Sequence, residues 1–192
     1  LAIESTPPTA LLEAADQLLP PDTAPPTLLV SDKYIDLFAF RPYAGFVAWS
    51  AHFSHPAGLF HQRIDLLTEL AATHSPALFY QALAQNRYDP INGLLLEPSE
   101  GGWHFRFADD NFPDRTVERT LHFNTALLAE PCFQRRAAGE LTLFEPAAAC
   151  PAAPAAGLEP GNLEAAALRY SLGRSFGEHI TGGPQPAELA QL

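Results

Sequence analysis

The first half of the chain combines short apolar runs with segments of helical periodicity. Residues 27–31 form an apolar run that ends in Ser31-Asp32, a pattern typical of a buried parallel strand with polar residues at its carboxyl end. Residues 46–50 give a second candidate strand. Apolar positions then recur at helical spacing after Pro56 and again after Ser75-Pro76, where proline suits the first helical position. This part of the pattern predicts a long helix and a shorter one.

The middle of the chain has the pattern of strands and hairpins. Residues 91–96 are almost continuously apolar, and a turn over residues 98–102 follows them. Trp103, Phe105 and Phe107 then alternate with polar residues, which predicts a hairpin strand with one wet face. Residues 91–96 are expected to be its partner across the turn, and a similar alternation over residues 117–123 predicts a further strand.

The pattern over residues 124–144 is less regular. Asn124 is a good helix cap, so we expect a helix that runs to Arg136 with a break at Pro131. Gly139 is expected to end that helix, because glycine is common just past a helix end. Residues 141–144 predict a final strand.

Proline and alanine content sets the expected domain boundaries. Residues 1–26 contain a short amphipathic stretch and several prolines and are expected to be an entry linker, followed by an α/β domain over residues 27–145. An Ala/Pro-rich linker is expected over residues 146–161, and a terminal helix and tail over residues 162–192. Helices between the early strands and hairpins afterwards predict an α/β fold, a single domain with a mixed β-sheet and flanking helices.

Composition and charge narrow the function classes. The 192 residues carry a net charge of −11 without a basic stripe, so nucleic acid is not an expected partner. No apolar run approaches the roughly 18 residues that a membrane span needs. The sequence contains no methionine, and we therefore expect it to be part of a longer protein.

The cysteines and the candidate metal ligands say little about function. Cys132 and Cys150 are the only cysteines, and a disulfide between them would stabilise the fold by about 3 kcal/mol. Two unrelated buried residues are the alternative. The histidines and the acidic residues near Asp109 lack the spacing of zinc or EF-hand sites, so no metal and no cofactor are expected. No nucleophile elbow or phosphate-binding loop is present in the sequence.

The segment 31–63 is the most unusual in composition, because it combines many aromatic rings with three histidines. Aromatic rings at strand and helix spacing usually belong to the core, but rings beside polar groups also suit a sugar surface. We single out four residues of the chain as candidates for such a surface: Trp49, His52, His55 and Trp103. The alternative is that the rings are core and that His52 and His55 hold a loop in place.

Four short motifs carry a resemblance to a known family. They are HFSHP (52–56), FHQRIDLLTELA (60–71), NRYDPINGLLL (86–96) and FADDNFPDRTVER (107–119). Over residues 31–145 the chain resembles the C-terminal soluble domain of actinobacterial arabinofuranosyltransferases, which are membrane glycosyltransferases of the GT-C type. The resemblance implies a multi-pass membrane half upstream, a decaprenylphosphoryl arabinose donor and a periplasmic or extracellular location at the plasma membrane. The catalytic acid of such enzymes lies in the membrane half, so no catalytic residue is carried over.

The resemblance leads to one main hypothesis and two rivals. The hypothesis is that the domain helps to bind the cell-wall galactan or arabinogalactan acceptor, or shapes the mouth of the active site. A structural module that binds its own membrane half or partner proteins would instead leave Trp49 and Phe53 exposed and indifferent to glycans. A secreted glycan-active enzyme would turn over glycans by itself.

Overall fold

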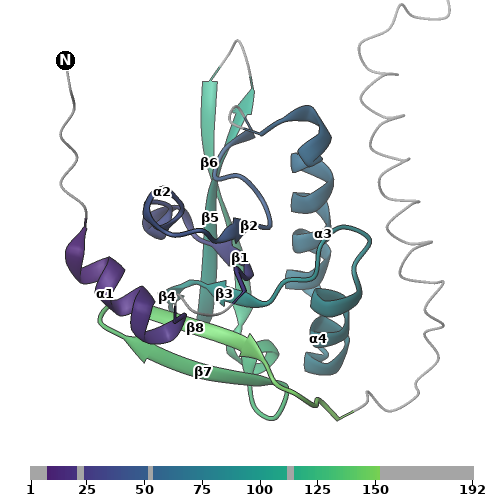
Figure 1. The fold of residues 1–192 in the computed structure, drawn as a ribbon. Coiled ribbons are helices and arrows are strands. Elements are labelled where there is room, and N and C mark those ends of the chain that lie inside the picture. Colours follow the sequence, from purple (N-terminus) through teal and green to yellow (C-terminus); the bar gives the residue numbers. More distant parts are fainter. Residues whose placement is uncertain (1–7, 21–23, 52–53, 112–114, 152–192) are drawn as a thin grey trace, which may run out of the picture. The chain divides into compact units, whose positions relative to one another are not determined.

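The computed structural model describes residues 8–20, 24–51, 54–111 and 115–151. Its strands form two sheets (Figure 1). The five-stranded sheet has the order β2-β1-β3-β8-β7. These strands are β2 (Ala44–Gly45), β1 (Thr27–Val30), β3 (Gly93–Leu95), β8 (Leu141–Pro146) and β7 (Phe133–Ala138). The three-stranded sheet contains β4 (Glu97–Ser99), β5 (Gly102–Asn111) and β6 (Arg115–Asn124).

The five-stranded sheet is mixed. Strand β1 is parallel to both of its neighbours, β2 and β3, whereas β8 is antiparallel to β3 and β7. The predicted hairpin has a different partner: β5 lies antiparallel to the short β4 and to β6 in the second sheet, whereas residues 93–95 form β3 of the larger sheet. The predicted α/β class with a mixed sheet is therefore confirmed.

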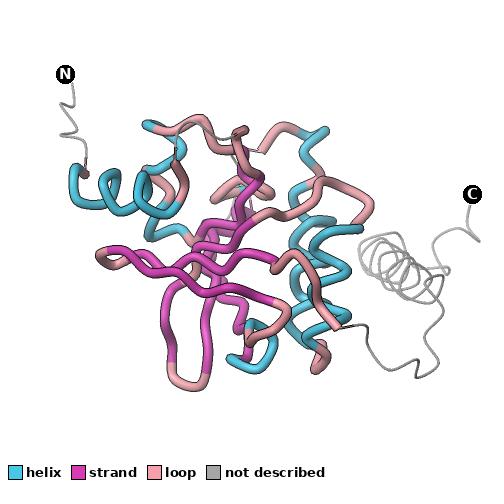
Figure 2. The backbone as a smooth tube through the Cα atoms, turned by 60° about the horizontal axis from the view of Figure 1, so that its bottom comes forward, coloured by secondary structure: helices cyan, strands magenta, loops and turns pink. Residues whose placement is uncertain are grey.

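Helices lie on both sides of the strands (Figure 2). In chain order they are α1 (Thr9–Leu18), the 3₁₀ turn η1 (Asp32–Tyr34), α2 (Leu37–Phe40), the 3₁₀ turn η3 (Pro56–Gly58), α3 (Phe60–Ala72), α4 (Pro76–Gln85) and the 3₁₀ turn η4 (Thr125–Leu128). One core cluster joins buried residues of α3 and α4 to the sheet, and a second cluster joins α1, η1 and α2 to it. Leu29 and Leu94 belong to the first cluster, and their neighbours Leu28 and Leu95 belong to the second. This alternation follows from strand geometry, in which successive side chains point to opposite faces.

The shorter predicted helix forms as expected. Ser75 adopts an extended conformation and its hydroxyl accepts a hydrogen bond from the Leu78 N–H at 3.3 Å. Pro76 takes the first helical position, where its missing N–H has no cost. Phe79 and Leu83, one turn apart, are both fully buried, so capping and burial together fix α4.

The longer predicted helix begins later than expected. Residues Pro56–Gly58 form a separate 3₁₀ turn, and α3 begins at Phe60. Leu59 between them has φ of +52°, in the left-handed region that interrupts a right-handed helix. Pro56 therefore begins a separate turn, and the helix expected to begin there starts at Phe60.

The strand expected over residues 46–50 is wrong. Only Ala44–Gly45 pair with β1, and the Phe46 N–H adds one hydrogen bond to the Leu28 carbonyl at 2.8 Å. Beyond Phe46 the chain leaves the five-stranded sheet, and Ser50 forms an isolated bridge with Ala108 of β5. Phe46, Val47 and Ser50 of this run are buried where it crosses from one sheet to the other.

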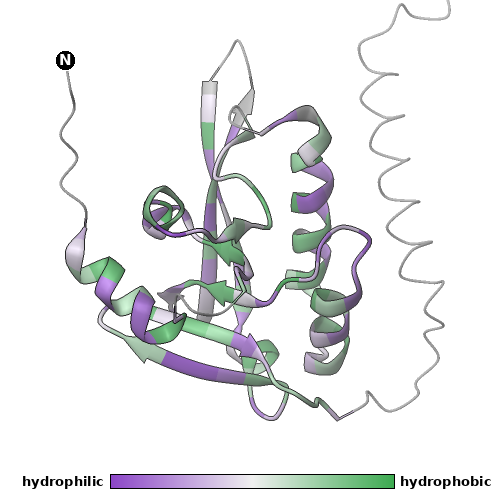
Figure 3. Cartoon of the chain, viewed as in Figure 1, coloured by the Kyte–Doolittle hydropathy of each residue, from purple (hydrophilic) through white to green (hydrophobic). Residues whose placement is uncertain are grey.

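The helix expected from Asn124 to Arg136 is also wrong. The Asn124 side chain caps only the single turn η4, accepting a hydrogen bond from the Ala126 N–H at 2.9 Å. From Phe133 the chain is strand β7, because pairing with β8 satisfies its backbone groups. Gly139, with φ of +54°, makes the turn between these strands. Figure 3 shows the hydrophilic stretch of β7, most of which is exposed.

The stretch expected to be an entry linker contains α1. This helix buries Leu11, Ala14, Ala15 and Leu18 in the second core cluster. Arg41 holds it in place through two bonds to the Asp16 carboxylate, of 2.6 Å from Nε and 2.5 Å from Nη2.

The expected terminal helix and tail, and most of the expected Ala/Pro-rich linker, lie outside the described residues. Within the described residues, none of the helices has the length and apolar character needed to cross a membrane.

Candidate functional site

The loop after β2 is fixed against the side of β5. The Trp49 carbonyl accepts a hydrogen bond from the Ala108 N–H at 2.9 Å, and Ser50 bridges the same residue. Phe46 and Val47 anchor the loop in the core, where they are 1% and 8% exposed. Trp49 itself is 39% exposed. The loop therefore has a fixed backbone and presents a large aromatic residue at the surface.

A set of polar residues surrounds the neighbouring position on β5. Asp109 follows Ala108, and its Oδ1 lies 3.4 Å from His61 Nε2 while its Oδ2 lies 2.6 Å from Arg119 Nε. The Asp109 side chain is 16% exposed, but those of His61 and Arg119 are 68% and 51% exposed. A mostly buried carboxylate thus orients two exposed nitrogen donors. Trp49 is related to this group through its backbone bond to Ala108, and we name Trp49, His61, Asp109 and Arg119 the Trp49 surface.

Trp103 lies elsewhere on the same strand. It is 8% exposed, the Phe144 ring meets it edge-on with centroids 4.8 Å apart, and the Arg135 guanidinium carbon lies 4.9 Å from its ring centroid. It is five positions from Ala108 along β5, about 16 Å at the usual rise of a strand. The structure therefore does not bring Trp103 and Trp49 together.

His55 is exposed and contributes to the turn before α3. Its Nδ1 accepts a hydrogen bond from the Ala57 N–H at 3.1 Å, and its carbonyl accepts one from the Gly58 N–H at 2.7 Å. These contacts fit the expectation that His55 holds the loop. His52, the fourth candidate, lies outside the described residues.

Sequence reasoning did not single out Asp109 or Arg119 for sugar binding, although a signal for Asp109 was present. Asp109 continues the alternation of Trp103, Phe105 and Phe107, so its side chain belongs to the core-facing side of β5. A carboxylate at a position that continues the row of buried aromatic residues marks the place where the buried face of β5 ends. His61 and Arg119 carry no comparable signal, because only the packing of α3 and β6 places them beside Asp109.

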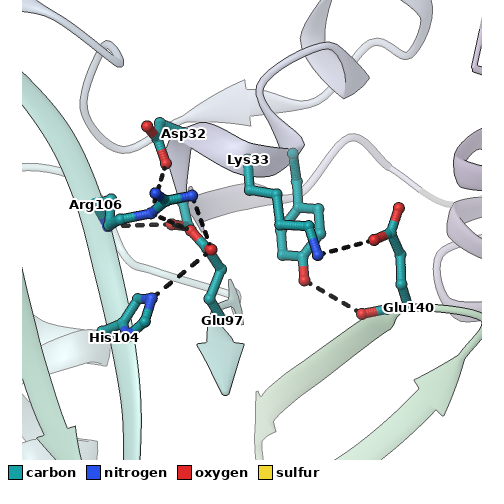
Figure 4. A network of polar contacts seen from close by, with 8 residues as sticks. Asp32, Lys33, Glu97, His104, Arg106 and Glu140 are labelled. Carbon is teal, nitrogen blue, oxygen red and sulfur yellow. Dashed lines mark hydrogen bonds and ion pairs between the residues drawn. The ribbon is translucent and has the colours of Figure 1, made fainter. Parts of the chain in front are cut away.

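A second polar cluster lies at the carboxyl ends of the parallel strands β1 and β3 (Figure 4). Arg106 of β5 donates from Nε to Glu97 Oε1 and from Nη2 to Oε2, both at 2.9 Å. Ser31 donates its hydroxyl to Glu97, and the Arg106 N–H donates to Ser31 Oγ at 3.0 Å. Asp32 Oδ1 lies 3.2 Å from Arg106 Nε, and His104 Nε2 lies 3.7 Å from Glu97 Oε2. We name these five residues the strand-end network.

The charges of the strand-end network are mutually stabilised. Burial raises the pKa of Glu97, but hydrogen bonds from Arg106 and Ser31 outweigh it and hold the pKa of that carboxyl below its ordinary value. The hydrogen bond to Glu97 raises the pKa of the Arg106 guanidinium. Glu97 is therefore a carboxylate and Arg106 a cation at neutral pH. The described residues contain no group of three or more histidine, cysteine or acidic side chains arranged to hold a metal ion.

The described part of the chain also contains a disulfide. Cys132 and Cys150 are bonded to each other across 18 positions of sequence. The Ala147 N–H donates to the Cys132 carbonyl at 2.9 Å, and the Tyr80 hydroxyl donates to the Ala147 carbonyl at 2.8 Å. These bonds fix the segment that follows β8 against α4 and the start of β7.

Comparison with known proteins gives the family. The model of the family described as "Arabinofuranosyltransferase A C terminal" matches residues 10–145, which include every described helix and strand except the first residue of α1 and the last of β8. A galactan 5-O-arabinofuranosyltransferase of Corynebacterium glutamicum is 26% identical over 121 residues, covering 57% of this chain. The matched region spans 18% of that relative's length. The resemblance seen in the four sequence motifs is confirmed, and the chain belongs to the family of arabinofuranosyltransferase A C-terminal domains.

Proposed function

We propose that this chain is the extracytoplasmic C-terminal domain of a membrane arabinofuranosyltransferase and that it helps to bind the glycan acceptor. The whole enzyme would transfer arabinofuranose from decaprenylphosphoryl arabinose to cell-wall galactan. The family match and the activity named for the Corynebacterium glutamicum relative support this assignment. In this proposal the membrane half upstream holds the donor and carries out the chemistry.

The disulfide supports an extracytoplasmic location. Structural disulfides persist in oxidising compartments and are rare in the reducing cytosol. Cys132 is 4% exposed and its bonded partner Cys150 is partly buried, so the bond belongs to the folded core and not to a flexible end. This location is where an acceptor in the cell wall is found.

The observation that carries the acceptor role is the Trp49 surface. An exposed indole ring packs well against the C–H face of a sugar, because such a contact buries apolar area on both sides. His61 and Arg119, oriented by Asp109, supply donors for sugar hydroxyls at the same position on β5. The fixed backbone at Trp49 lowers the entropic cost of binding.

The test uses the two tryptophans of the chain as paired reporters. In ¹H–¹⁵N NMR spectra each gives one indole N–H signal, and Trp49→Phe assigns them. On titration with galactan oligosaccharides we expect the Trp49 signal to shift and the Trp103 signal to stay, since Trp103 is buried. Trp49→Ala should abolish binding at the Trp49 surface, read at the backbone amides of Ala108 and Asp109. Phe40→Ala, at an aromatic residue that is 37% exposed in α2, is the matched control and should leave it unchanged.

A second candidate function is a protein-interaction module, favoured by the exposure of Phe40, Trp49 and Leu59 at 37%, 39% and 40%. An interaction surface is marked by a contiguous apolar patch, whereas single exposed apolar residues are common on any protein. If the chain is an interaction module, millimolar glycan leaves both indole signals unmoved, and the acceptor role is refuted. Turnover of glycans by the isolated chain would support the secreted-enzyme alternative instead.

A further inference from the structure

We propose that the strand-end network is a second sugar-binding site, specific for a neutral ligand with adjacent hydroxyl groups. Asp32, His104 and Arg106 are its contact residues. The inference rests on the proposed function only for the identity of the glycan. It adds a second point at which the acceptor meets this domain.

The position of the network follows from the topology of the five-stranded sheet. The chain leaves β1 through η1 and α2 to reach β2 on one side of it, and returns through α3 and α4 to reach β3 on its other side. The first connection packs in one core cluster and the second in the other, so they cover opposite faces of the sheet. The carboxyl ends of β1 and β3 are therefore a topological switch point, the usual ligand position in open α/β sheets.

The residues at this switch point are polar and partly exposed. Ser31 and Asp32 directly follow β1, and Glu97 follows β3, while Arg106 and His104 reach them from β5 (Figure 4). The side chains of Asp32, His104 and Arg106 are 30%, 20% and 38% exposed, whereas that of Glu97 is 10% exposed. Glu97 thus holds the network together from inside, and the other three are available to a ligand.

The same face of the hairpin adds further polar groups. His104 lies opposite His122 in the pairing of β5 with β6, and their ring centroids are 5.8 Å apart. Thr120 lies opposite Arg106. Both Thr120 and His122 are exposed. The wet face of the hairpin therefore continues the network with hydroxyl and imidazole groups.

The donors and acceptors match a pair of sugar hydroxyls. Each hydroxyl both donates and accepts, so a diol needs an acceptor and a donor close together. Asp32 Oδ1 is buried and lies 3.2 Å from Arg106 Nε, whereas the Asp32 side chain as a whole is 30% exposed, so its accessible acceptor is the other oxygen, Oδ2. An accessible carboxylate oxygen beside a partly exposed guanidinium group meets the need of a diol for one acceptor and one donor.

The charge of the site disfavours an anionic ligand. Arg106 is neutralised by Glu97 and Asp32, and Lys33 is neutralised by Glu140 at 2.8 Å. The three carboxylates exceed the two cations, so a phosphate would meet a net negative site. Neutral hydroxyl groups carry no such penalty.

The second site is separate from the Trp49 surface. Arg106 and Asp109 lie three positions apart on β5, so their side chains point to opposite faces of that strand. Arg106 faces η1 and the strand ends, and Asp109 faces α3 through its contact with His61. Each site can therefore be tested with its own reporter in one titration.

The experiment is an NMR titration of the chain with galactan oligosaccharides and, separately, with inorganic phosphate. We expect the Arg106 Nε–H signal and the backbone amides of residues 31–34 to shift with glycan and not with phosphate. Asp32→Asn should weaken the affinity read at Arg106 by about tenfold, since it removes a charged acceptor. The Trp49 indole shift should persist in this variant. Asp36→Asn makes the same charge change at an exposed position of the same segment and should have no effect.

Three results would overturn the inference. If the Trp49 signal moves with glycan while the signals of Arg106 and residues 31–34 do not, the second site is absent and the proposed function stands. If phosphate and not glycan shifts Arg106, the site binds anions. If Asp32→Asn and Asp36→Asn weaken binding equally, the loss comes from the change in net charge and not from a contact between Asp32 and the glycan. A matching backbone spectrum of each variant shows that it is folded.

Discussion

Arg106 holds both carboxylate oxygens of Glu97, with Nε 2.9 Å from Oε1 and Nη2 2.9 Å from Oε2. Glu97 begins β4 just after β3, and Ser31 at the end of β1 donates to the same carboxylate. Both residues belong to the three-stranded sheet, and their hydrogen bonds with Ser31 join that sheet to the end of β1 in the larger sheet. Paired charges of this kind stabilise strongly only while both are present.

Replacement of Glu97 should make stability depend less on pH. Glu97→Gln removes the charge that Arg106 contacts with two nitrogens, and we expect a loss of about 2 kcal/mol in the free energy of unfolding at pH 7. The folded pKa of Glu97 lies below its ordinary value of 4.5, so the contribution is complete above that pH and disappears as the pH falls through the folded pKa. Urea unfolding at pH 7 and at pH 3 should show the difference between wild type and variant shrinking in acid.

Glu140→Gln is the matched control for this experiment. It removes an ion pair with Lys33 in which the Glu140 side chain is 56% exposed, and such surface pairs contribute about 0–1 kcal/mol. An equal loss in both variants at pH 7 would contradict the special role assigned to Glu97.

The two tryptophans should respond differently to truncation. Trp103→Ala leaves a cavity beside Phe144 and should lower the free energy of unfolding by about 3–5 kcal/mol. Trp49→Ala removes an exposed ring and should change it by at most about 0.5 kcal/mol. Urea unfolding followed by far-UV circular dichroism measures both. A large loss at Trp49 would show that its ring is part of the core.

Reduction of the disulfide should lower the stability of the fold. The bond between Cys132 and Cys150 closes a loop of 18 positions, for which the chain-entropy model gives about 3 kcal/mol. Thermal unfolding with and without dithiothreitol should show a lower midpoint under reducing conditions. In the double variant Cys132→Ala/Cys150→Ala the midpoint should be low and unaffected by the reductant. A reductant effect in that variant would mean that another process is being measured.

The cap of α4 should contribute a smaller, local amount. Ser75→Ala removes the acceptor for the Leu78 N–H, and we expect a loss of about 1 kcal/mol. Ser75→Asp keeps an acceptor and adds a favourable charge at the helix N-terminus, so its stability should equal or exceed that of the wild type. Urea midpoints of the three proteins test this order, and equal midpoints for alanine and aspartate would contradict it.

Local pattern determined the elements whose signals are local. The Ser75-Pro76 cap, the alternation of Trp103, Phe105 and Phe107, and the apolar run of β3 all predicted the observed element. The family also followed from the sequence, because short motifs from several elements match it together. In these cases the residues carry their own capping, turn or burial preference.

Tertiary structure decided what depends on residues far apart in the chain. The secondary structure of residues 46–50, an apolar run, and of residues 133–136, a mostly polar run, depends on which strand lies beside each. Ser50 bridges Ala108, so the first run is a crossing loop. The second run pairs with β8 and is therefore a strand. Hydrogen bonds to other strands, and not local propensity, satisfy these backbone groups.

The candidate sites divide in the same way. The sequence alone marked Trp49 as an unusual aromatic residue and Asp32 as the end of a strand. The tertiary structure separated Trp49 from Trp103, placed His61 and Arg119 on Asp109, and brought Arg106 to Asp32 and Glu97 across 74 and 9 positions of sequence. The reason is physical, since ion pairs and ring exposure depend on how helices and strands pack, which the pattern of a single segment does not specify.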